Sequence, residues 1–294
     1  MRKARTSFSR ALPSVATLAA TALLVAGLFV GPLNAATAGA SSATKASGTV
    51  DVLYAGSFLN VMEQRIGPAF HRATGYTVSG FSNGSTALAS EIEGRTQVGD
   101  VFISASPSAD ASLEGTANGN WVSSYQEFGT STLVLGYNPK SKFAKDLLNK
   151  PWYDVVDLPG FLLGRTDPAI DPKGVLAVDA LRGVALSYDI PALDALATST
   201  KNVYEETALV GELQAGQLDA GFFYQVEADA ANLKTVPLVA TQLAAEYTVA
   251  ILNRAPHEAA AKAFVKFLLG AQGQKILKEY GVTPMVPAQT FRAP

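Results

Sequence analysis

The chain has 294 residues, of which 48% are hydrophobic and 16% are charged, and its formal net charge is −2. This balance is typical of a globular protein with a substantial core, and it gives no electrostatic attraction to nucleic acid or to an anionic membrane surface. The absence of cysteine excludes disulfides, thiolate metal sites and a lipid-modified cysteine. With His71 and His257 as the only histidines, a multi-histidine metal site is excluded as well.

The N-terminal segment has the pattern of an export signal. Positive charges at Arg2, Lys3, Arg5 and Arg10 precede an apolar stretch at 15–30, and small residues follow it. This stretch of about sixteen residues is shorter than the roughly 20 that span a bilayer, so we expect cleavage rather than retention as an anchor. We predict a signal peptide at 1–40, a flexible leader at 41–48, and a mature protein that is secreted or held in the periplasm or cell envelope.

Strand-like and helix-like runs alternate along the first half of the mature chain. Apolar residues at helical spacing indicate helices, and short apolar, β-branched runs indicate strands. In chain order we predict a strand at 49–55, a helix at 58–74, a strand at 76–81, a helix at 86–93, a strand at 98–104, a helix at 107–114 and a strand at 132–137. This alternation predicts a mostly parallel sheet with helices on both faces.

The second half repeats the same pattern. We predict a strand at 161–164, helices at 174–188 and 208–215, strands at 220–224 and 247–252, and helices at 257–269 and 272–280. The layout favours two Rossmann-like α/β lobes joined by a hinge, each with a mixed, mostly parallel sheet. Residues 49–136 plus 246–294 form the first predicted lobe, and residues 137–245 form the second.

Polar loops follow several of the predicted strands. Ala55-Gly56-Ser57 and Asn83-Gly84-Ser85 each lie between a strand and a helix, where backbone N–H groups and a hydroxyl can hold a small anion without a positive charge. Other polar loops lie at 104–106, 166–174 and 224–227. Ligands of open α/β sheets bind beyond the carboxyl ends of the strands, so these loops predict one shared site. For any single serine the alternative is a helix cap.

Two carboxylates, Asp171 and Glu227, and the hydroxyl of Tyr224 also fall in these loops. Carboxylates repel an anion unless they accept a proton from a protonated oxyanion or bind its central metal directly. The alternative is that Asp171 is a solvated loop residue and that Glu227 stabilises a helix N-terminus. The sequence leaves both interpretations open.

Five motifs in order resemble those of the molybdate- and tungstate-binding proteins of ABC importers, which have the periplasmic binding protein type II fold. The resemblance runs from about Val50 to Pro284, and its motifs are Ala55-Gly56-Ser57, Asn83-Gly84-Ser85-Thr86, Gly99–Ser106, Asp167–Gly174 and Asp219–Ala228. It implies that Ser57, Ser85 and the N–H of Ala105 hold the ion between two lobes. It also implies a contact from Asp171.

In the branch of this family with a hexacoordinate metal, the resemblance implies that Asp171 is a direct ligand to molybdenum or tungsten, paired with a glutamate. Glu227 is the candidate for that glutamate. The chain departs from this branch, because Lys173-Gly174-Val175-Leu176 stands where Cys-Gly-Tyr-Arg is expected. Phe223 also stands where some members have the carboxylate.

We therefore expect an extracytoplasmic solute-binding protein that captures molybdate or tungstate and delivers it to an ABC permease and its ATPase. We expect a monomer with no cofactor, no nucleic-acid partner and no enzymatic activity. Sulfate or phosphate is an alternative ligand. A transcription regulator is disfavoured by the export signal and by the lack of a DNA-binding segment.

An alternative from another class is a secreted serine hydrolase. Gly80-Phe81-Ser82-Asn83-Gly84 fits the G-x-S-x-G elbow, and Asp171 and His257 follow in the order of α/β-hydrolases. No HGGG-like oxyanion segment precedes Ser82, however, and the motif comes earlier in the chain than that fold usually places it.

Overall fold

The structure is a computed structural model that describes residues 46–293 of the chain. The predicted signal peptide and residues 41–45 of the predicted leader therefore lie outside the described residues. Within 46–293, no helix has both the length and the apolar composition that a membrane span requires.

The strands follow the predicted order with several additions. They are β1 (Thr49–Ala55), β2 (Thr77–Asn83), β3 (Val101–Ser104), β4 (Ser124–Tyr137), β5 (Leu163–Thr166), β6 (Val203–Tyr204), β7 (Ala220–Tyr224), β8 (Lys234–Pro237), β9 (Ala244–Ile251) and β10 (Thr283–Arg292). The sequence did not predict β6, β8 or β10. Pro284 and Pro287 argue against a strand interior, and β10 accommodates them because, among the strands of residues 46–293, it pairs with β4 alone.

The helices are α1 (Leu59–Val61), α2 (Gly67–Thr74), α3 (Ser85–Glu93), α4 (Pro107–Ala111), α5 (Ala144–Asn149), α6 (Trp152–Val156), α7 (Pro172–Tyr188), α8 (Pro191–Thr198), α9 (Leu209–Gln214), α10 (Gln225–Ala230), α11 (Glu258–Leu269) and α12 (Ala271–Glu279). The predicted helix at 58–74 is α1 and α2 joined by a π-helical turn at Met62–Ile66. It ends at Gly75, whose φ of 91° is the left-handed conformation that glycine adopts readily.

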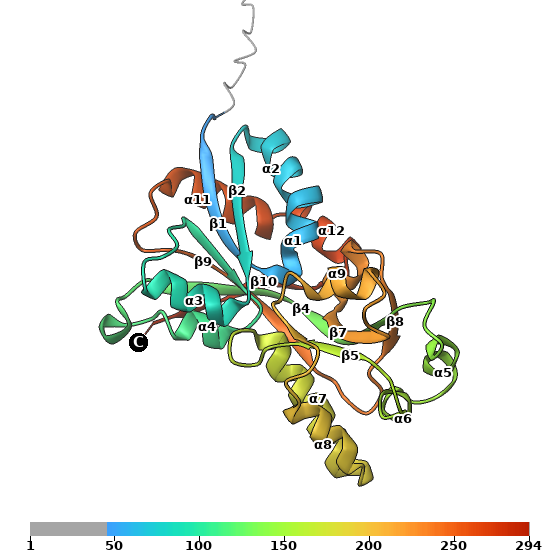
Figure 1. Ribbon diagram of the computed structural model, residues 1–294. Coiled ribbons are helices and arrows are strands. Elements are labelled where there is room, and N and C mark those ends of the chain that lie inside the picture. The colour runs from blue at the N-terminus through green and yellow to red at the C-terminus, as the bar shows by residue number, and fades with distance from the viewer. Residues whose placement is uncertain (1–45, 294) are drawn as a thin grey trace, which may run out of the picture. The chain divides into compact units, whose positions relative to one another are not determined.

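The strands form one mixed sheet in the order β2-β1-β3-β9-β4-β7-β5-β6 (Figure 1). β1 runs parallel to β2 and β3, and β5 runs parallel to β6 and β7, as the alternation of strands and helices predicted. β9 is antiparallel to β3 and β4, and β4 is antiparallel to β7. The predicted α/β fold class with a mixed sheet is confirmed.

The long strand β4 connects two parts of this sheet. Residues 124–132 pair with β9 and β10, whereas residues 133–137 pair with β7 and β8. The sequence predicted only the second part of this strand, because Gln126, Glu127 and Gly129 interrupt the apolar run before it. The division into lobes at 49–136 plus 246–294 and at 137–245 remains a prediction.

Helices pack on both faces of the first part of the sheet. Val52 and Tyr54 of β1 belong to the same core cluster as Phe264 of α11, whereas Leu53 packs with Leu88 of α3. Consecutive side chains of a strand point to opposite faces, so β1 contributes to two layers of core. Figure 1 shows α3 and α4 on one side of β1, β3 and β9, and α11 on the other.

Candidate functional site

Two serines and a backbone amide follow the carboxyl ends of β1, β2 and β3. Ser57 lies in a short 3-10 turn, Ser85 begins α3, and Ala105 follows β3. The Ala105 N–H donates to Ser85 Oγ at 3.0 Å, and the hydroxyls of Ser57 and Tyr247 share a hydrogen bond of 2.8 Å. All four residues are buried. Tyr247, which lies in β9, is a neighbour that the sequence did not indicate.

Asp171 caps the N-terminus of α7 and lies against the second serine turn. Its Oδ1 accepts a hydrogen bond from the backbone N–H of Lys173, and Pro172 occupies the first helical position. A Cβ on Gly84 would lie 2.4 Å from the carbonyl oxygen of Ile170 and 3.0 Å from Asp171 Cβ. Glycine is therefore required at Gly84 for the two loops to approach this closely.

Lys173 forms ion pairs with two buried glutamates, Glu206 and Glu227. Together with Asp171 and Tyr224, these residues form the cluster described below. Lys173 Nζ lies 2.7 Å from Glu227 Oε2 and 3.0 Å from Glu206 Oε1, and the lysine side chain is 0% exposed. No sequence pattern predicted a role for Lys173 or Glu206. One signal was present: a cation in the first turn of α7 opposes the helix dipole, which favours a carboxylate partner nearby. Glu206 lies in the loop before α9 and carried no such signal.

Three buried polar atoms in this cluster have no hydrogen-bond partner among the described residues. They are Asp171 Oδ2, Glu206 Oε2 and the hydroxyl oxygen of Tyr224. Such atoms are rare in folded proteins, because leaving a buried polar group unpaired costs about 1–3 kcal/mol. A cavity of about 180 Å³, lined in part by Gly56, Ser57, Glu206 and Glu227, borders the cluster.

Burial dominates the electrostatics of the three carboxyl groups. It raises the pKa of Asp171 and Glu227 and raises that of Glu206 well above its ordinary value, while the charge of Lys173 lowers all three in part. Burial alone would lower the pKa of Lys173, but the surrounding carboxylates outweigh it and raise that pKa. Lys173 therefore stays charged, and the carboxyl groups hold protons at a higher pH than usual.

The phenols of Tyr224 and Tyr247 lie next to these charges. Burial raises the pKa of each phenol well above 10, and the neighbouring carboxylates raise it further. Both hydroxyls therefore stay neutral and can donate hydrogen bonds at physiological pH. The ring centroids of Tyr224 and Tyr247 lie 6.1 Å apart, with the rings at 76° to each other.

The residues of the serine-hydrolase alternative do not assemble into a triad. Ser82 lies in β2 in register with Tyr54 of β1. His257 instead donates its backbone N–H to Asp100 and lies 3.0 Å from that carboxylate through Nδ1, with Asp51 3.5 Å away. The partner carboxylates of His257 are thus Asp51 and Asp100, and Asp171 has its contacts with Lys173. Ser82, Asp171 and His257 therefore follow the order of a hydrolase triad along the chain without forming a triad in the structure.

Comparison with known proteins identifies the family of the chain. The family model of the bacterial extracellular solute-binding proteins matches residues 50–283. The molybdate/tungstate-binding protein WtpA of Pyrococcus abyssi is 26% identical over 224 residues, which cover 58% of this chain and 65% of WtpA. The chain thus spans slightly less than two thirds of the length of that relative.

Solved structures share the fold at lower identity. The periplasmic molybdate-binding protein of Azotobacter vinelandii superposes with a TM-score of 0.61 at 19% identity, covering 80% of this chain and 98% of that one. The sulfate-binding protein SubI of Mycobacterium tuberculosis H37Rv gives a TM-score of 0.63 at 17% identity, covering 82% and 88%. The family model, which matches most of the chain, describes solute-binding proteins, so the prediction of a binding protein is confirmed.

Proposed function

The chain belongs to the bacterial extracellular solute-binding proteins, and on that premise we propose that it captures molybdate or tungstate and delivers it to an ABC transporter. The observation that carries the proposal is the cluster at the carboxyl ends of the strands. It combines hydroxyl and N–H groups with buried polar atoms that have no partner. Such atoms are satisfied when a ligand with complementary groups enters the cluster.

The proposed ligand is held between two lobes, 49–136 plus 246–294 and 137–245, that close around it. Contacts between the two proposed lobes support this closure. The Ala87 N–H donates to the Ile170 carbonyl at 3.0 Å, and the Val226 N–H donates to Ser131 Oγ at 3.0 Å. Gly56 also lies directly against Glu206. Closure of this kind excludes water, which strengthens each polar contact to the ion.

The proposed site divides the recognition chemistry between the lobes. Ser57, Ser85 and Ala105 supply hydroxyl and N–H dipoles from the first lobe. Asp171, Lys173, Glu206, Tyr224 and Glu227 supply the charged groups and a phenol from the second. Neutral donors suit the oxygens of a tetrahedral ion, and the ammonium of Lys173 offsets the repulsion between that ion and the carboxyl groups.

The carboxyl oxygens can serve the ligand in two ways. A protonated Asp171 donates to an oxygen of the ion, and its raised pKa favours that form. An ionised Asp171 instead binds the metal atom through Oδ2, together with a second carboxylate. Each glutamate has one oxygen bonded to Lys173, and the other oxygen of Glu206 is unpartnered and therefore suits that second position.

The test compares four oxyanions by thermal unfolding of the chain without its signal peptide. Molybdate and tungstate are expected to raise the melting temperature with a concentration dependence that gives Kd, because a ligand that binds only the folded state stabilises it. Sulfate and phosphate are expected to give much smaller shifts. Equal shifts with all four ions, or a shift with none, would overturn the ligand assignment.

A further inference from the structure

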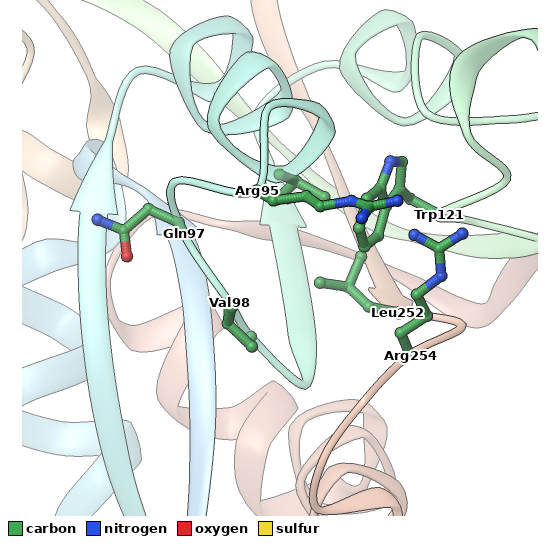
Figure 2. A pocket seen from close by; sticks show the side chains of 8 residues that line it. Arg95, Gln97, Val98, Trp121, Leu252 and Arg254 are labelled. Carbon is green, nitrogen blue, oxygen red and sulfur yellow. The ribbon is translucent and has the colours of Figure 1, made fainter.

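A second pocket, of about 300 Å³, lies at the opposite end of β3 from Ala105 (Figure 2). Its lining comes from the loop before β3, from Trp121 and from the turn after β9. Arg95, Val98, Trp121 and Arg254 form its walls, while Ile92 and Leu252 are its most buried lining residues. None of these residues belongs to the cluster around Lys173, so the pocket is a separate feature of the molecule.

Two arginines in this pocket share one indole ring. Arg254 Cζ lies 4.1 Å from the centre of the Trp121 ring, and Arg95 Cζ lies 5.7 Å from it. Figure 2 shows both guanidinium groups beside that ring. These are cation–π contacts, which fix the position of a guanidinium without neutralising its charge.

Neither guanidinium has a carboxylate partner among residues 46–293. Arg254 uses one N–H to bond the Gly119 carbonyl at 3.2 Å. A guanidinium carries five N–H donors in a planar fork, so donors remain on both groups. Both arginines are exposed, and an oxyanion bound beside them would accept charge-assisted hydrogen bonds from these donors.

The backbone at Arg95 is in an unfavourable conformation. α3 ends at Glu93, Gly94 is its C-cap, and Arg95 follows with a φ of 58°. Glycine is the usual residue in this left-handed position after a helix, because a side chain there is strained. Here the strained residue is the arginine that reaches Trp121. Strain of this kind is a reason to look for a function.

An apolar surface adjoins the two guanidinium groups. Ile92 and Leu252 are 1% and 4% exposed, and Val98 at the edge of the pocket is 66% exposed. We propose that the pocket binds a small organic anion, with a carboxylate or phosphate group bound by the guanidinium groups of Arg95 and Arg254 and a flat apolar body against Val98 and Trp121. The cavity volume is at the lower end of the range typical of small-molecule sites.

Tryptophan fluorescence can measure ligand binding at this pocket. It has two tryptophans, and Trp152 is 1% exposed with its indole N–H bonded to the Val239 carbonyl. Ligand-dependent quenching therefore reports on Trp121. Benzoate and phenyl phosphate carry the two anionic groups on a flat ring, and benzamide is a neutral analogue of the same shape. Titration of the wild-type protein with all three needs no variant to fold.

We expect saturable quenching by benzoate, by phenyl phosphate or by both, and no saturation by benzamide. The anion that binds more tightly shows whether the pocket prefers a carboxylate or a phosphate group. R95Q and R254Q are each expected to weaken binding at least about tenfold, which is the loss of one charge-assisted contact. Arg182, an exposed arginine paired with Asp194 on α8, gives the matched control R182Q, which should bind like the wild type.

Equal quenching by benzamide and benzoate would overturn the proposal. Absence of saturation by both anions up to about 10 mM, a concentration that covers even millimolar affinities, would also overturn it. So would unchanged affinity in R95Q and R254Q. The molybdate and tungstate measurements do not depend on these residues, so failure of this proposal and failure of the proposed function are distinguishable.

Discussion

Lys173 and Glu206 form an ion pair that is sealed from solvent. The Nζ and Oε1 atoms lie 3.0 Å apart, and the side chains are 0% and 2% exposed. A Cβ on Gly56 would lie 1.5 Å from the other oxygen of Glu206, so the backbone of the first serine turn closes directly over this carboxylate. The charge balance of the cluster therefore depends on a contact between residues that are far apart in the sequence.

Replacing Lys173 with methionine should destabilise the protein strongly. K173M leaves Glu206 and Glu227 buried without their counter-ion, and breaking a buried pair in this way costs about 3–5 kcal/mol. Without the ammonium the carboxyl pKa values rise further, so the loss should be larger at pH 8 than at pH 5. Urea unfolding at both pH values measures this. K150M, which removes an exposed pair with Asp146, is the control and should cost less than about 1 kcal/mol. Equal losses in the two variants would contradict the prediction.

Asp110 in α4 should make stability fall as pH rises from about 4 to about 7. Burial raises the pKa of Asp110 from 3.8 to about 7, against the opposing effect of the hydrogen bond from Thr248. In this window the folded state keeps a proton that the unfolded state releases. The unfolding free energy therefore drops by about 1.4 kcal/mol per pH unit, or about 4 kcal/mol in all, and levels off above pH 7.

D110N removes this contribution and should make the pH dependence less steep over the same window, leaving the part due to the other buried carboxyl groups. Urea unfolding at half-unit intervals of pH compares it with the wild type. D179N, at an exposed position of α7, is the matched control and should keep the wild-type slope. A D110N slope equal to that of the wild type would show that Asp110 is not the group responsible.

Alanine at Gly56 should destabilise the protein and, under the proposed function, weaken oxyanion binding. The new Cβ forces the Glu206 carboxylate away from Lys173, and overpacking of this kind costs about 1–3 kcal/mol. G183A gives the opposite expectation. Gly183 lies within α7 with no atom near its Cβ position, so alanine there should stabilise by about 0.5–1 kcal/mol. Chemical unfolding and calorimetry check both variants. If G56A has the stability and the oxyanion affinity of the wild type, the close packing of Gly56 against Glu206 is refuted.

Amide substitutions test the role of the carboxyl groups in the proposed site. If Asp171 and Glu206 bind the metal atom, D171N and E206Q should each weaken molybdate binding at least about tenfold, whereas an amide can still donate a hydrogen bond where a protonated carboxyl does. If the groups only repel the anion, affinity should stay the same or rise, and that result would exclude them as ligands. Calorimetric titration at pH 5 and pH 8 separates the two chemistries, because proton donation from Asp171 is lost as its carboxyl ionises at higher pH.

Ser82 in β2 and Ser85 in the turn that follows should differ in their importance. Ser85 is fully buried and its Oγ accepts the Ala105 N–H, so S85A should weaken oxyanion binding and leave that N–H without its partner. Ser82 lies within β2, where S82A should leave binding unchanged. Calorimetric titration of both variants decides the matter. A larger loss in S82A than in S85A would refute the proposed use of Ser85.

Local sequence patterns predicted much of the fold. The alternation of apolar strands and amphipathic helices indicated β1, α3, β3 and α7, because burial of a strand or a helix face leaves a clear period in the sequence. The long first part of β4 and the edge strand β10 left no such period. Their polar residues and prolines are tolerated because they pair with particular neighbours, and that pairing is a tertiary property.

The sequence indicated where the candidate site lies. The turns that carry Ser57, Ser85 and Asp171 follow strands, and parallel strands bring their carboxyl ends to one edge of the sheet. The net charge of that site depends on contacts that form only in the tertiary structure. Lys173 and Glu206 are 33 residues apart, and Gly56 lies in another part of the chain. Because electrostatic energy depends on distance and burial rather than on residue order, no local pattern could indicate that one lysine neutralises two glutamates there.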